Sequence, residues 1–351
     1  MLTTLLALTL TATLPAAAPP EVAAAVPRLL QSHEVPAVAI AVVEDGELAW
    51  TAVFGERRPG DPADDGTLFN VASMTKPVVA ELALRMAARG DFGLDDPMAA
   101  HWVDPDIAGD PRHLELTPRL ALQHRTGLPN WRRETEGKLA LRFDPGTRAG
   151  YSGEGFDYLG RFLEQRSGEP LTALAGTTLL APLGMSDTRF VFEPALEDRL
   201  AWPSRPGGES REPVRRDDWS AADDLLTTPA DYGRFLASVL SGEGLTDDLR
   251  AQRWQLPENQ FAGGCPWGPD ECPRAGGFAL GWAVFEYEAE TVVSQGGADW
   301  GERALGLIVP ERQLAVAIFT NSSNGMKVIA GLLPLLYDNP DFQAFVEFQA
   351  R

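Results

Sequence analysis

Cysteine, lysine and histidine are scarce in this sequence, which limits the metal chemistry that it can support. The 351 residues include two cysteines, three lysines and four histidines. A zinc site at the cysteines would need two more ligands, and no histidine lies near them in the sequence. The histidines lack the spacing of metal ligands, so we predict no metal site and expect a structural or surface role for His33, His101, His113 and His124.

Several common enzyme signatures are missing as well. The chain has no Gly-x-Ser-x-Gly element, no phosphate-cradling glycine loop and no Gly-x-Gly-x-x-Gly after an expected strand. A hydrolase with a Ser-His-Asp triad and a nucleotide-dependent enzyme are therefore not favoured. We predict no organic cofactor.

Positive charge is also in deficit, because 50 acidic residues face 30 basic ones and the formal net charge is −20. Binding to nucleic acid or to an anionic lipid surface needs a concentrated positive face, which the sequence lacks. We interpret the acidity as a solubility device. With 44% hydrophobic and 23% charged residues, the composition is that of a soluble globular protein, whose oligomeric state is left open.

The first 18 residues form an uncharged, apolar segment that ends in Ala16, Ala17 and Ala18. Such a segment resembles a secretory signal and is too short for a comfortable membrane span. We predict cleavage near Ala18, which gives an exported, periplasmic or secreted protein without stable membrane insertion. The usual positive n-region is missing, which leaves an uncleaved N-terminal anchor as the alternative.

The two cysteines, Cys265 and Cys272, lie in a turn-rich segment with five glycines and prolines between residues 263 and 269. In an exported protein this pattern predicts a small disulfide loop. We expect it to tie down a loop and to take no part in the chemistry.

Strand patterns gather at the two ends of the chain. The apolar runs 37–43 and 48–54 flank an Asp45-Gly46 pair, which is a strong hairpin signal. Near the C-terminus, short turns suited to antiparallel pairing link further expected strands at 280–285, 292–294, 304–309 and 314–320.

Helical patterns fill the middle of the chain. Residues 78–89 have apolar positions at helical spacing, and Thr117-Pro118 and Thr228-Pro229 each place a capping hydroxyl before a proline. We predict an α+β fold with an antiparallel sheet made from both chain ends and a helical lobe, about residues 95–220, inserted between them. Residues 21–351 then form one catalytic domain, and a cleft between its lobes is the expected site.

The segment before the first of these helices carries the most informative spacing. Ser73 and Lys76 lie three positions apart, on one face of the first turn if the helix begins near Ser73. A serine hydroxyl needs a neighbouring base, and a desolvated lysine can serve. Pro77 fits such a helix start, because in the first turn its missing N–H has no intrahelical acceptor to lose. The alternative is a helix-capping serine beside a solvated lysine.

These residues resemble the serine β-lactamase and penicillin-binding-protein superfamily, especially its class C-like branch of β-lactamases, esterases and D-amino-acid peptidases. Together the matching stretches run from about residue 30 to 325 in the expected order. An ordered set of this kind is more specific than any one motif. Further matching stretches are Leu122–Pro129, Asp144–Gly153, Pro182–Met185 and Leu225–Asp231.

The resemblance implies roles for residues far from Ser73 in the sequence. Tyr151 would share a proton with Ser73 and Lys76, and which of Lys76 and Tyr151 is the main base is left open. Packing of Tyr151 in the core is the alternative. A further motif of the family lies on the strand that lines the cleft and normally reads Lys or His, then Thr, Ser or Gly, then Gly. It corresponds here to Gln295-Gly296-Gly297, for which an ordinary loop glycine pair is the alternative. The resemblance implies that the N–H groups of Ser73 and Ala298 form the oxyanion hole.

Two departures from the family pattern bear on the substrate. Gly153 stands where an asparagine is common, and neutral Gln295 stands where the family has a cation. Both changes remove groups that would hold the acylamino and carboxylate groups of penicillins and peptidoglycan stems. Trp131 and Trp300 follow cleft-forming segments and are candidates for shaping an aromatic acyl pocket, with ordinary packing as the alternative.

The sequence therefore predicts a serine hydrolase that acts on a small carboxylic ester or amide through a Ser-Lys-Tyr acyl-enzyme mechanism. An esterase fits the departures best. The alternatives are a β-lactamase, a D-aminopeptidase or D,D-carboxypeptidase, and a catalytically degenerate protein that binds a cell-wall fragment.

Overall fold

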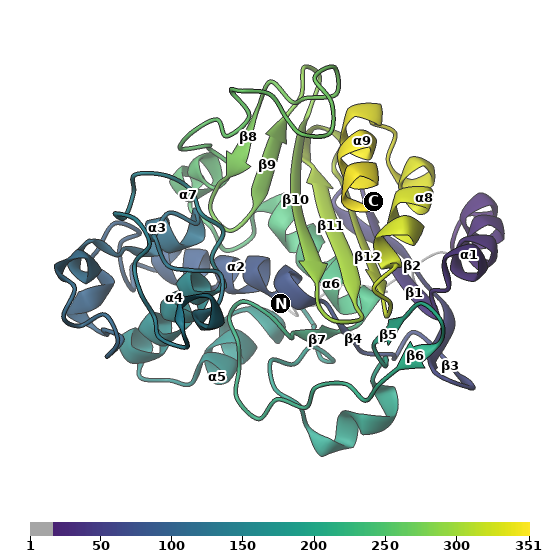
Figure 1. The fold of residues 1–351 in the computed structure, drawn as a ribbon, viewed down its shortest axis with the longest axis horizontal. Coiled ribbons are helices and arrows are strands. Elements are labelled where there is room, and N and C mark those ends of the chain that lie inside the picture. Colours follow the sequence, from purple (N-terminus) through teal and green to yellow (C-terminus); the bar gives the residue numbers. More distant parts are fainter. Residues whose placement is uncertain (1–16) are drawn as a thin grey trace, which may run out of the picture.

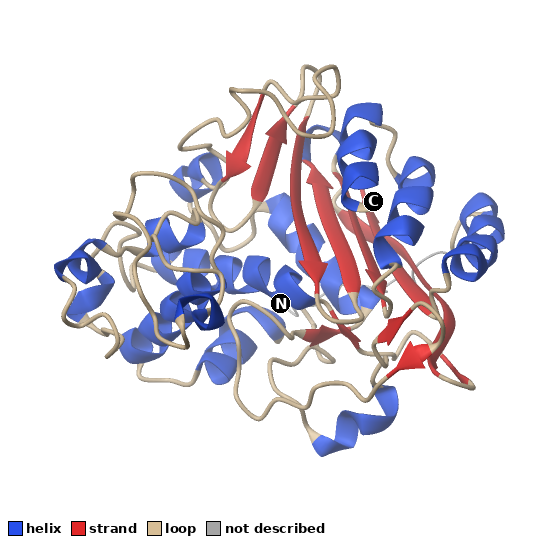
Figure 2. Cartoon of the chain, viewed as in Figure 1, coloured by secondary structure: helices blue, strands red, loops and turns tan. Residues whose placement is uncertain are grey.

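The structure, a computed structural model, describes residues 17–351, so that the predicted signal segment 1–18 lies almost wholly outside the described residues. An eight-stranded antiparallel sheet with helices on both faces forms one lobe, and a lobe of short helices and long loops lies beside it (Figures 1 and 2). The predicted α+β fold is confirmed.

The sheet contains strands from both ends of the chain. Its order is β3-β2-β1-β12-β11-β10-β9-β8, and all neighbouring strands run antiparallel. The predicted hairpin 37–54 is the β1–β2 pair, and the predicted C-terminal strands are β9 to β12. The bounds are β1 Ala37–Glu44, β2 Glu47–Arg58, β3 Asp61–Pro62, β8 Ala275–Phe278, β9 Ala283–Glu286, β10 Thr291–Ala298, β11 Arg303–Val309 and β12 Leu314–Thr320.

The centre of the sheet is buried on both faces, so its strands need apolar side chains on both faces, as strand β1 shows. Successive side chains of a strand point to opposite faces. Ala39 and Ala41 pack in one apolar core and Ile40 and Val42 in another, on the two sides of the sheet. A covered sheet therefore explains why β1 reads as a continuous apolar run and does not alternate with polar residues.

Two groups of helices cover the sheet. Helices α2, Thr75–Ala88, and α6, Pro229–Ser241, belong to the core on one face. Helices α1, Pro20–His33, α8, Gly325–Leu336, and α9, Pro340–Gln349, belong to the core on the other face. Helices α1, α8 and α9 were not predicted from the sequence.

The second lobe packs on the far side of α2. Its helices are α3, Pro118–Leu122, α4, Gly153–Ser167, α5, Leu171–Ala175, and α7, Asp247–Gln252. Because α2 lies between the sheet and this lobe, every residue from Thr75 to Met86 is buried. Within the segment 95–220 that we expected to form the helical lobe, residues 204–210 instead lie against the sheet lobe, because Ser204 forms a bridge with Ser322 (Figure 1). They form a two-residue strand pair, β5 Ser204–Arg205 with β6 Glu209–Ser210.

The predicted helix caps are present. The Thr117 hydroxyl accepts a hydrogen bond from the N–H of Leu120 at the start of α3, and the Thr228 hydroxyl accepts one from the N–H of Asp231 at the start of α6. These bonds satisfy N–H groups that the first turn of a helix leaves without partners.

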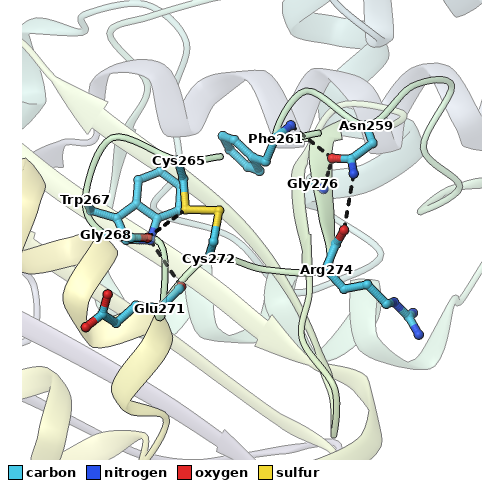
Figure 3. Close-up of a disulfide and its surroundings, with 9 residues drawn as sticks. All are labelled: Asn259, Phe261, Cys265, Trp267, Gly268, Glu271, Cys272, Arg274 and Gly276. Carbon is cyan, nitrogen blue, oxygen red and sulfur yellow. Dashed lines mark hydrogen bonds between the residues drawn. A yellow bond between two sulfur atoms is a disulfide. The ribbon is translucent and has the colours of Figure 1, made fainter. Parts of the chain in front are cut away.

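The disulfide between Cys265 and Cys272 is present and closes the loop that precedes β8 (Figure 3). The side chain of Asn259 ties the two ends of this loop together, because its oxygen accepts from the N–H groups of Phe261 and Gly276 and its nitrogen donates to the carbonyl of Arg274. Within residues 17–351, no helix has the length and apolarity needed to cross a bilayer.

Candidate active site

A tight turn before α2 presents Ser73. The chain enters through β4, Phe69–Asn70, which pairs with β7, Leu226–Thr227, and then forms a 3-10 turn over Ala72–Met74. Ala72 has a φ of 48°, in the left-handed region that costs about 1–3 kcal/mol for a side chain with a Cβ atom. The Asn70 side chain accepts a hydrogen bond from the N–H of Ala72 at 2.8 Å, which helps to hold this turn.

Lys76 lies beneath Ser73, as the spacing predicted. Its side chain is fully buried, and its Nζ lies 2.9 Å from Ser73 Oγ. Nζ also donates to the carbonyl of Ala222 at 2.8 Å. The alternative of a solvated lysine is therefore wrong, and the amine is fixed within proton-transfer distance of the hydroxyl.

Strand β10 passes against the Ser73 turn, and Gly297 permits the approach. A Cβ atom at Gly297 would lie 2.1 Å from the carbonyl oxygen of Val71, which is too close for any side chain. At Gly296 the nearest neighbour of such an atom is 3.8 Å away. Gly297 therefore brings the strand into backbone contact with the turn, whereas packing does not require Gly296 to be glycine.

Tyr151 lies over Lys76, on the opposite wall of the site. Lys76 Nζ is 4.8 Å from the centre of the tyrosine ring. The Tyr151 hydroxyl oxygen accepts a hydrogen bond from Gln295 Nε2 at 3.1 Å, and the same amide nitrogen donates to the carbonyl of Gly296 at 2.8 Å. Gln295 thus gives the phenol a neutral donor in the place where the family pattern has a cation.

His124 holds the backbone on both sides of Tyr151. Its carbonyl accepts from the N–H of Gly150 at 2.8 Å, and its Nδ1 accepts from the N–H of Ser152 at 3.0 Å. Burial lowers the pKa of His124 well below its usual range, and the charge of Lys76 adds to this effect. The expected structural role of His124 is present, but the sequence did not show that the histidine holds Tyr151.

Trp131 fills the space beside Gly153. A Cβ atom at Gly153 would lie 2.8 Å from the carbonyl oxygen of Asn130 and 3.0 Å from the Trp131 ring. The centre of that ring is 5.9 Å from Lys76 Nζ, within the range of a cation–π contact. The indole therefore lies where a larger side chain at position 153 would reach toward Lys76.

The other predicted tryptophan is not brought to the site. Trp300 is covered by the guanidinium groups of Arg205 and Arg211, which lie 4.4 and 3.9 Å from its ring centre. It follows β10 in the sequence but is not among the residues that line the cleft described below. Its contacts are those of a packed surface aromatic.

Two buried carboxyl groups, those of Asp157 and Asp223, lie close enough to Lys76 to be influenced by its charge. Asp157 accepts from the N–H of Ala221, next to the residue whose carbonyl binds Lys76, and burial raises the pKa of Asp157 to about 6. Burial also raises the pKa of Asp223, with repulsion from Asp224 adding to the effect. Among the described residues, carboxylate oxygens of Asp223, Asp224 and Asp299 lie within 4.8 Å of one another, but Asp224 is paired with Arg216, so we assign no metal to them.

A cleft of about 720 Å³ opens above Ser73. It gathers residues that the sequence predicted for the site from three separate segments, because the Ser73 turn, the start of α4 and strand β10 converge on it. The predicted residues that line it are Ser73, Tyr151, Gln295, Gly296, Gly297 and Ala298. Gly153 and Trp131 are not part of this lining, and the Trp131 ring lies near Lys76 with Gly153 against it.

Comparison with known families decides the chain's affiliation. The Beta-lactamase family model matches residues 22–333. The chain belongs to the Beta-lactamase family. Its members are serine hydrolases, and the resemblance inferred from Ser73, Lys76 and the ordered motifs is confirmed.

Two curated members of the family show how broad the chain's similarities are. The esterase EstB of Burkholderia gladioli is 34% identical over 222 residues, which are 54% of this chain and 55% of EstB. The match thus spans about half the length of that relative. The D-alanyl-D-alanine-carboxypeptidase/endopeptidase AmpH of Escherichia coli is 25% identical over 310 residues, which are 80% of this chain and 78% of AmpH.

Two solved structures share the fold. The octameric penicillin-binding protein homologue from Pyrococcus abyssi has a TM-score of 0.75 at 20% identity, over 94% of this chain and 80% of that one. SurE has a TM-score of 0.71 at 23% identity, over 90% of this chain and 74% of that one.

Proposed function

We propose that this protein is an esterase that forms an acyl-enzyme on Ser73. The observation that carries the proposal is the 2.9 Å distance between Lys76 Nζ and Ser73 Oγ at the base of an open cleft. No water separates a nucleophile from its base at this distance, so one proton transfer activates the hydroxyl. Residues 21–351 act as one catalytic domain in this proposal.

The first step is attack of Ser73 on the substrate carbonyl. In this step the amine of Lys76 acts as the base and takes the hydroxyl proton, and the ammonium that results is held by the carbonyl of Ala222 and by the faces of Tyr151 and Trp131. Tyr151 then hands a proton to the leaving group after a small movement of its hydroxyl away from Gln295, since catalytic hydrogen bonds often tighten only with substrate bound. Water releases the acyl group by the reverse sequence.

The oxyanion of this step would be bound by the N–H groups of Ser73 and Ala298. Gly296 and Ala298 are two positions apart on β10, so their backbone polar groups point to the same edge. The Gly296 carbonyl accepts from the Gln295 side chain, which indicates that this edge faces the cleft. That orientation supports the assignment of the Ala298 N–H.

The proposed substrate class follows from two binding groups that are missing at positions 153 and 295. Trp131 blocks a hydrogen-bonding side chain at Gly153, and Gln295 is neutral, so the two groups that would bind an acylamino group and a carboxylate are absent from these positions. An ester without those groups loses nothing by their absence. The name of the relative EstB agrees with this choice.

The names of other relatives support a second candidate function. AmpH is named as a D-alanyl-D-alanine-carboxypeptidase/endopeptidase and a further relative, from Amycolatopsis lactamdurans, as penicillin-binding protein 4. A peptidase or β-lactamase reaction would use the same nucleophile and base. A degenerate binding protein would keep the cleft but not the turnover.

One panel separates these functions. Initial rates are measured with p-nitrophenyl butyrate, a D-alanyl-D-alanine peptide, a D-amino-acid p-nitroanilide and a chromogenic cephalosporin, with Ser73→Ala as control. We expect ester hydrolysis to dominate and to vanish in Ser73→Ala, with stoichiometric labelling of Ser73 by a fluorophosphonate. Preference for the cephalosporin or a peptide would overturn the esterase assignment, and an unlabelled Ser73 in folded protein would favour the binding function.

We also propose that the protein is exported. The uncharged segment 1–18 and the disulfide between Cys265 and Cys272 support an oxidising compartment outside the cytoplasm. Fractionation of cells expressing the full chain, followed by N-terminal sequencing, tests this. A mature protein that begins near Pro19 is expected, whereas intact protein in the cytoplasm with free thiols would contradict the proposal.

A further inference from the structure

The cleft continues past Ser73 over an open edge of the sheet. Within the described chain, β9 pairs with β10 only as far as Ser294, so residues 295–298 of β10 have no strand beside them on that side. The cleft reaches over this edge from Tyr151 to the sheet face that α8 and α9 cover. We call the part beyond the edge the α9 arm, and define it by Phe285, Leu305, Met326, Phe345, Val346 and Gln349.

The α9 arm is apolar. Gln349 is its one polar side chain and stands at the exposed end of helix α9. Arg303 is the charged side chain of the cleft lining, and its guanidinium is occupied by the carbonyls of Asp299 and Glu302 at 2.6 and 2.7 Å. The arm can therefore desolvate an apolar group without stranding a charge.

The disulfide loop braces the wall of this arm. Trp267, inside the loop, lies with its ring centre 5.0 Å from that of Phe345 and 6.5 Å from that of Phe285. Its indole N–H donates to the carbonyl of Glu271 at 3.2 Å, so the ring is held from within the loop (Figure 3). The aromatic wall is thus fixed before any substrate arrives, as in preformed ligand pockets.

The position of Tyr151 indicates which part of the substrate enters the arm. The phenol lies at the end of the open edge where β9 begins, bonded to Gln295, and its ring is 5.7 Å from that of Phe278 on β8. A residue that protonates a leaving group must lie beside that group. The arm opens at the same end, through Ala283 and Phe285.

We propose that the α9 arm binds the alcohol part of an ester and that this alcohol is bulky and apolar, of the benzyl or naphthylmethyl kind. The proposal rests on the esterase function. Ser73 Oγ forms a bond to the acyl carbon, the bond from that carbon to the alkoxy oxygen breaks, and the alkoxy oxygen takes its proton from Tyr151. The released alcohol then occupies the arm until it leaves and water enters.

The test varies the alcohol and the acyl group separately. Ethyl, benzyl and naphthylmethyl butyrate vary the alcohol, and the alcohol ratio is kcat/KM for benzyl butyrate divided by that for ethyl butyrate. Ethyl butyrate and ethyl 3-phenylpropanoate vary the acyl group, and the acyl ratio is kcat/KM for the second divided by that for the first. All reactions are followed by pH-stat. We expect kcat/KM to rise at least tenfold from ethyl to benzyl butyrate, as for burial of a group of this size. Gln349→Trp should narrow the arm and lower this ratio at least fivefold, while the acyl ratio stays unchanged.

Matched variants on the same helix serve as controls. Glu347 is exposed and lies outside the cleft lining, so Glu347→Trp should leave both ratios unchanged. Phe345→Ala should lower the benzyl preference, whereas Phe348→Ala, outside the lining, should not. Melting temperatures of all variants identify any loss of fold, and the exposed Gln349 and Glu347 positions keep the test independent of core packing.

The outcomes distinguish this inference from the proposed function. If the protein hydrolyses esters but Gln349→Trp leaves the alcohol ratio unchanged, the inference about the α9 arm is wrong and the proposed esterase function stands. A change confined to the acyl ratio would assign the arm to the acyl part instead and overturn it as well. Absence of any ester turnover, with Ser73 unlabelled, would refute both.

Discussion

The rings of His124 and Tyr151 are in contact, with their centres 4.3 Å apart and their planes tilted by 33°, and the histidine also binds the backbone on either side of the tyrosine. Because Tyr151 is the proposed proton donor, we expect His124 to act on the reaction without touching the substrate. Its contribution divides into two parts, the ring contact and the hydrogen bond that Nδ1 accepts from the N–H of Ser152.

Two substitutions at His124 separate these parts. Asn keeps an acceptor near the N–H of Ser152 and tolerates the φ of 55° at this position, whereas Phe keeps the ring and loses the acceptor. We expect kcat/KM to fall about 100-fold in His124→Phe, because small misplacements of catalytic groups cost that much, and to fall less than tenfold in His124→Asn. Equal losses in both variants, at equal melting temperature, would contradict a role for the hydrogen bond.

Protonation of His124 at acidic pH should lower the stability of the folded protein. The pKa of His124 is lower in the folded protein than its ordinary value near 6.5, so the stability that neutral His124 contributes is present above that pH and is lost as the pH falls below it. The melting temperature of His124→Asn should therefore fall less than that of the wild type between pH 6.5 and 5. Parallel curves for the two proteins would show that His124 takes no part in acid sensitivity.

The paired glycines of β10 offer an internally controlled test of the Ser73 turn. Alanine at Gly297 would place a Cβ atom 2.1 Å from the carbonyl oxygen of Val71, so the turn must move. We expect the rate of fluorophosphonate labelling of Ser73 to fall about 100-fold and the melting temperature to fall in Gly297→Ala. Gly296→Ala should keep both values, because its Cβ atom would meet its nearest neighbour at 3.8 Å, an ordinary van der Waals contact. A Gly297→Ala variant that labels normally would show that the turn is not fixed by the strand.

The contact between Trp131 and Gly153 should appear as an energetic coupling. Trp131→Ala removes one aromatic face from Lys76, which we expect to lower kcat/KM about 2- to 30-fold, the range of a cation–π contact. Gly153→Ala adds a methyl group against the Trp131 ring, so its loss of stability should be smaller when Trp131 is already alanine. Thermal unfolding of the two single variants and the double variant measures the coupling, expected at about 0.5–3 kcal/mol. Strict additivity would mean that the carbonyl of Asn130, and not the indole, limits position 153.

Glu302 should make the protein less stable in alkaline than in mildly acidic solution. Burial, with added repulsion from Asp299 and Asp224, raises the pKa of Glu302 from 4.5 to about 7. A raised carboxyl pKa contributes stability that is complete below 4.5 and is lost as the pH rises through 7. Between pH 5 and 8, the free energy of unfolding measured with urea should decrease by on the order of 2 kcal/mol less in Glu302→Gln than in the wild type. The exposed control Glu288→Gln should show the same decrease as the wild type. Identical pH dependence in wild type and Glu302→Gln would contradict the assignment.

Local signals in the sequence were enough to predict the contact between Ser73 and Lys76. The helix that follows Ser73 fixes the spacing of Ser73 and Lys76, and a helix start is readable from proline and apolar periodicity. The strands of the sheet were equally readable, because turn residues separate short apolar runs. The resemblance then added Tyr151 and the β10 segment, which lie far away in the sequence.

Contacts between segments that are distant in the sequence could not be predicted from local patterns. Nothing near His124 in the sequence indicates that it binds residues 150–152, since the contact depends on how two loops pack. Trp300 was a candidate for the cleft because it follows β10, but Arg205 and Arg211 cover it from a separate hairpin. The helix α9 was missed altogether, because its role depends on the sheet face that it covers.

The pairing of β1 with β12 joins residues 37–44 to residues 314–320 at the middle of the sheet. When the first three hundred residues have been synthesised, β1 has β2 beside it on one edge, but the strand that pairs with its other edge has not yet been made. Contacts this distant in sequence slow folding. The chain is thus suited to folding only after its synthesis is complete, and a truncation that removes β12 should yield insoluble protein and not a smaller enzyme.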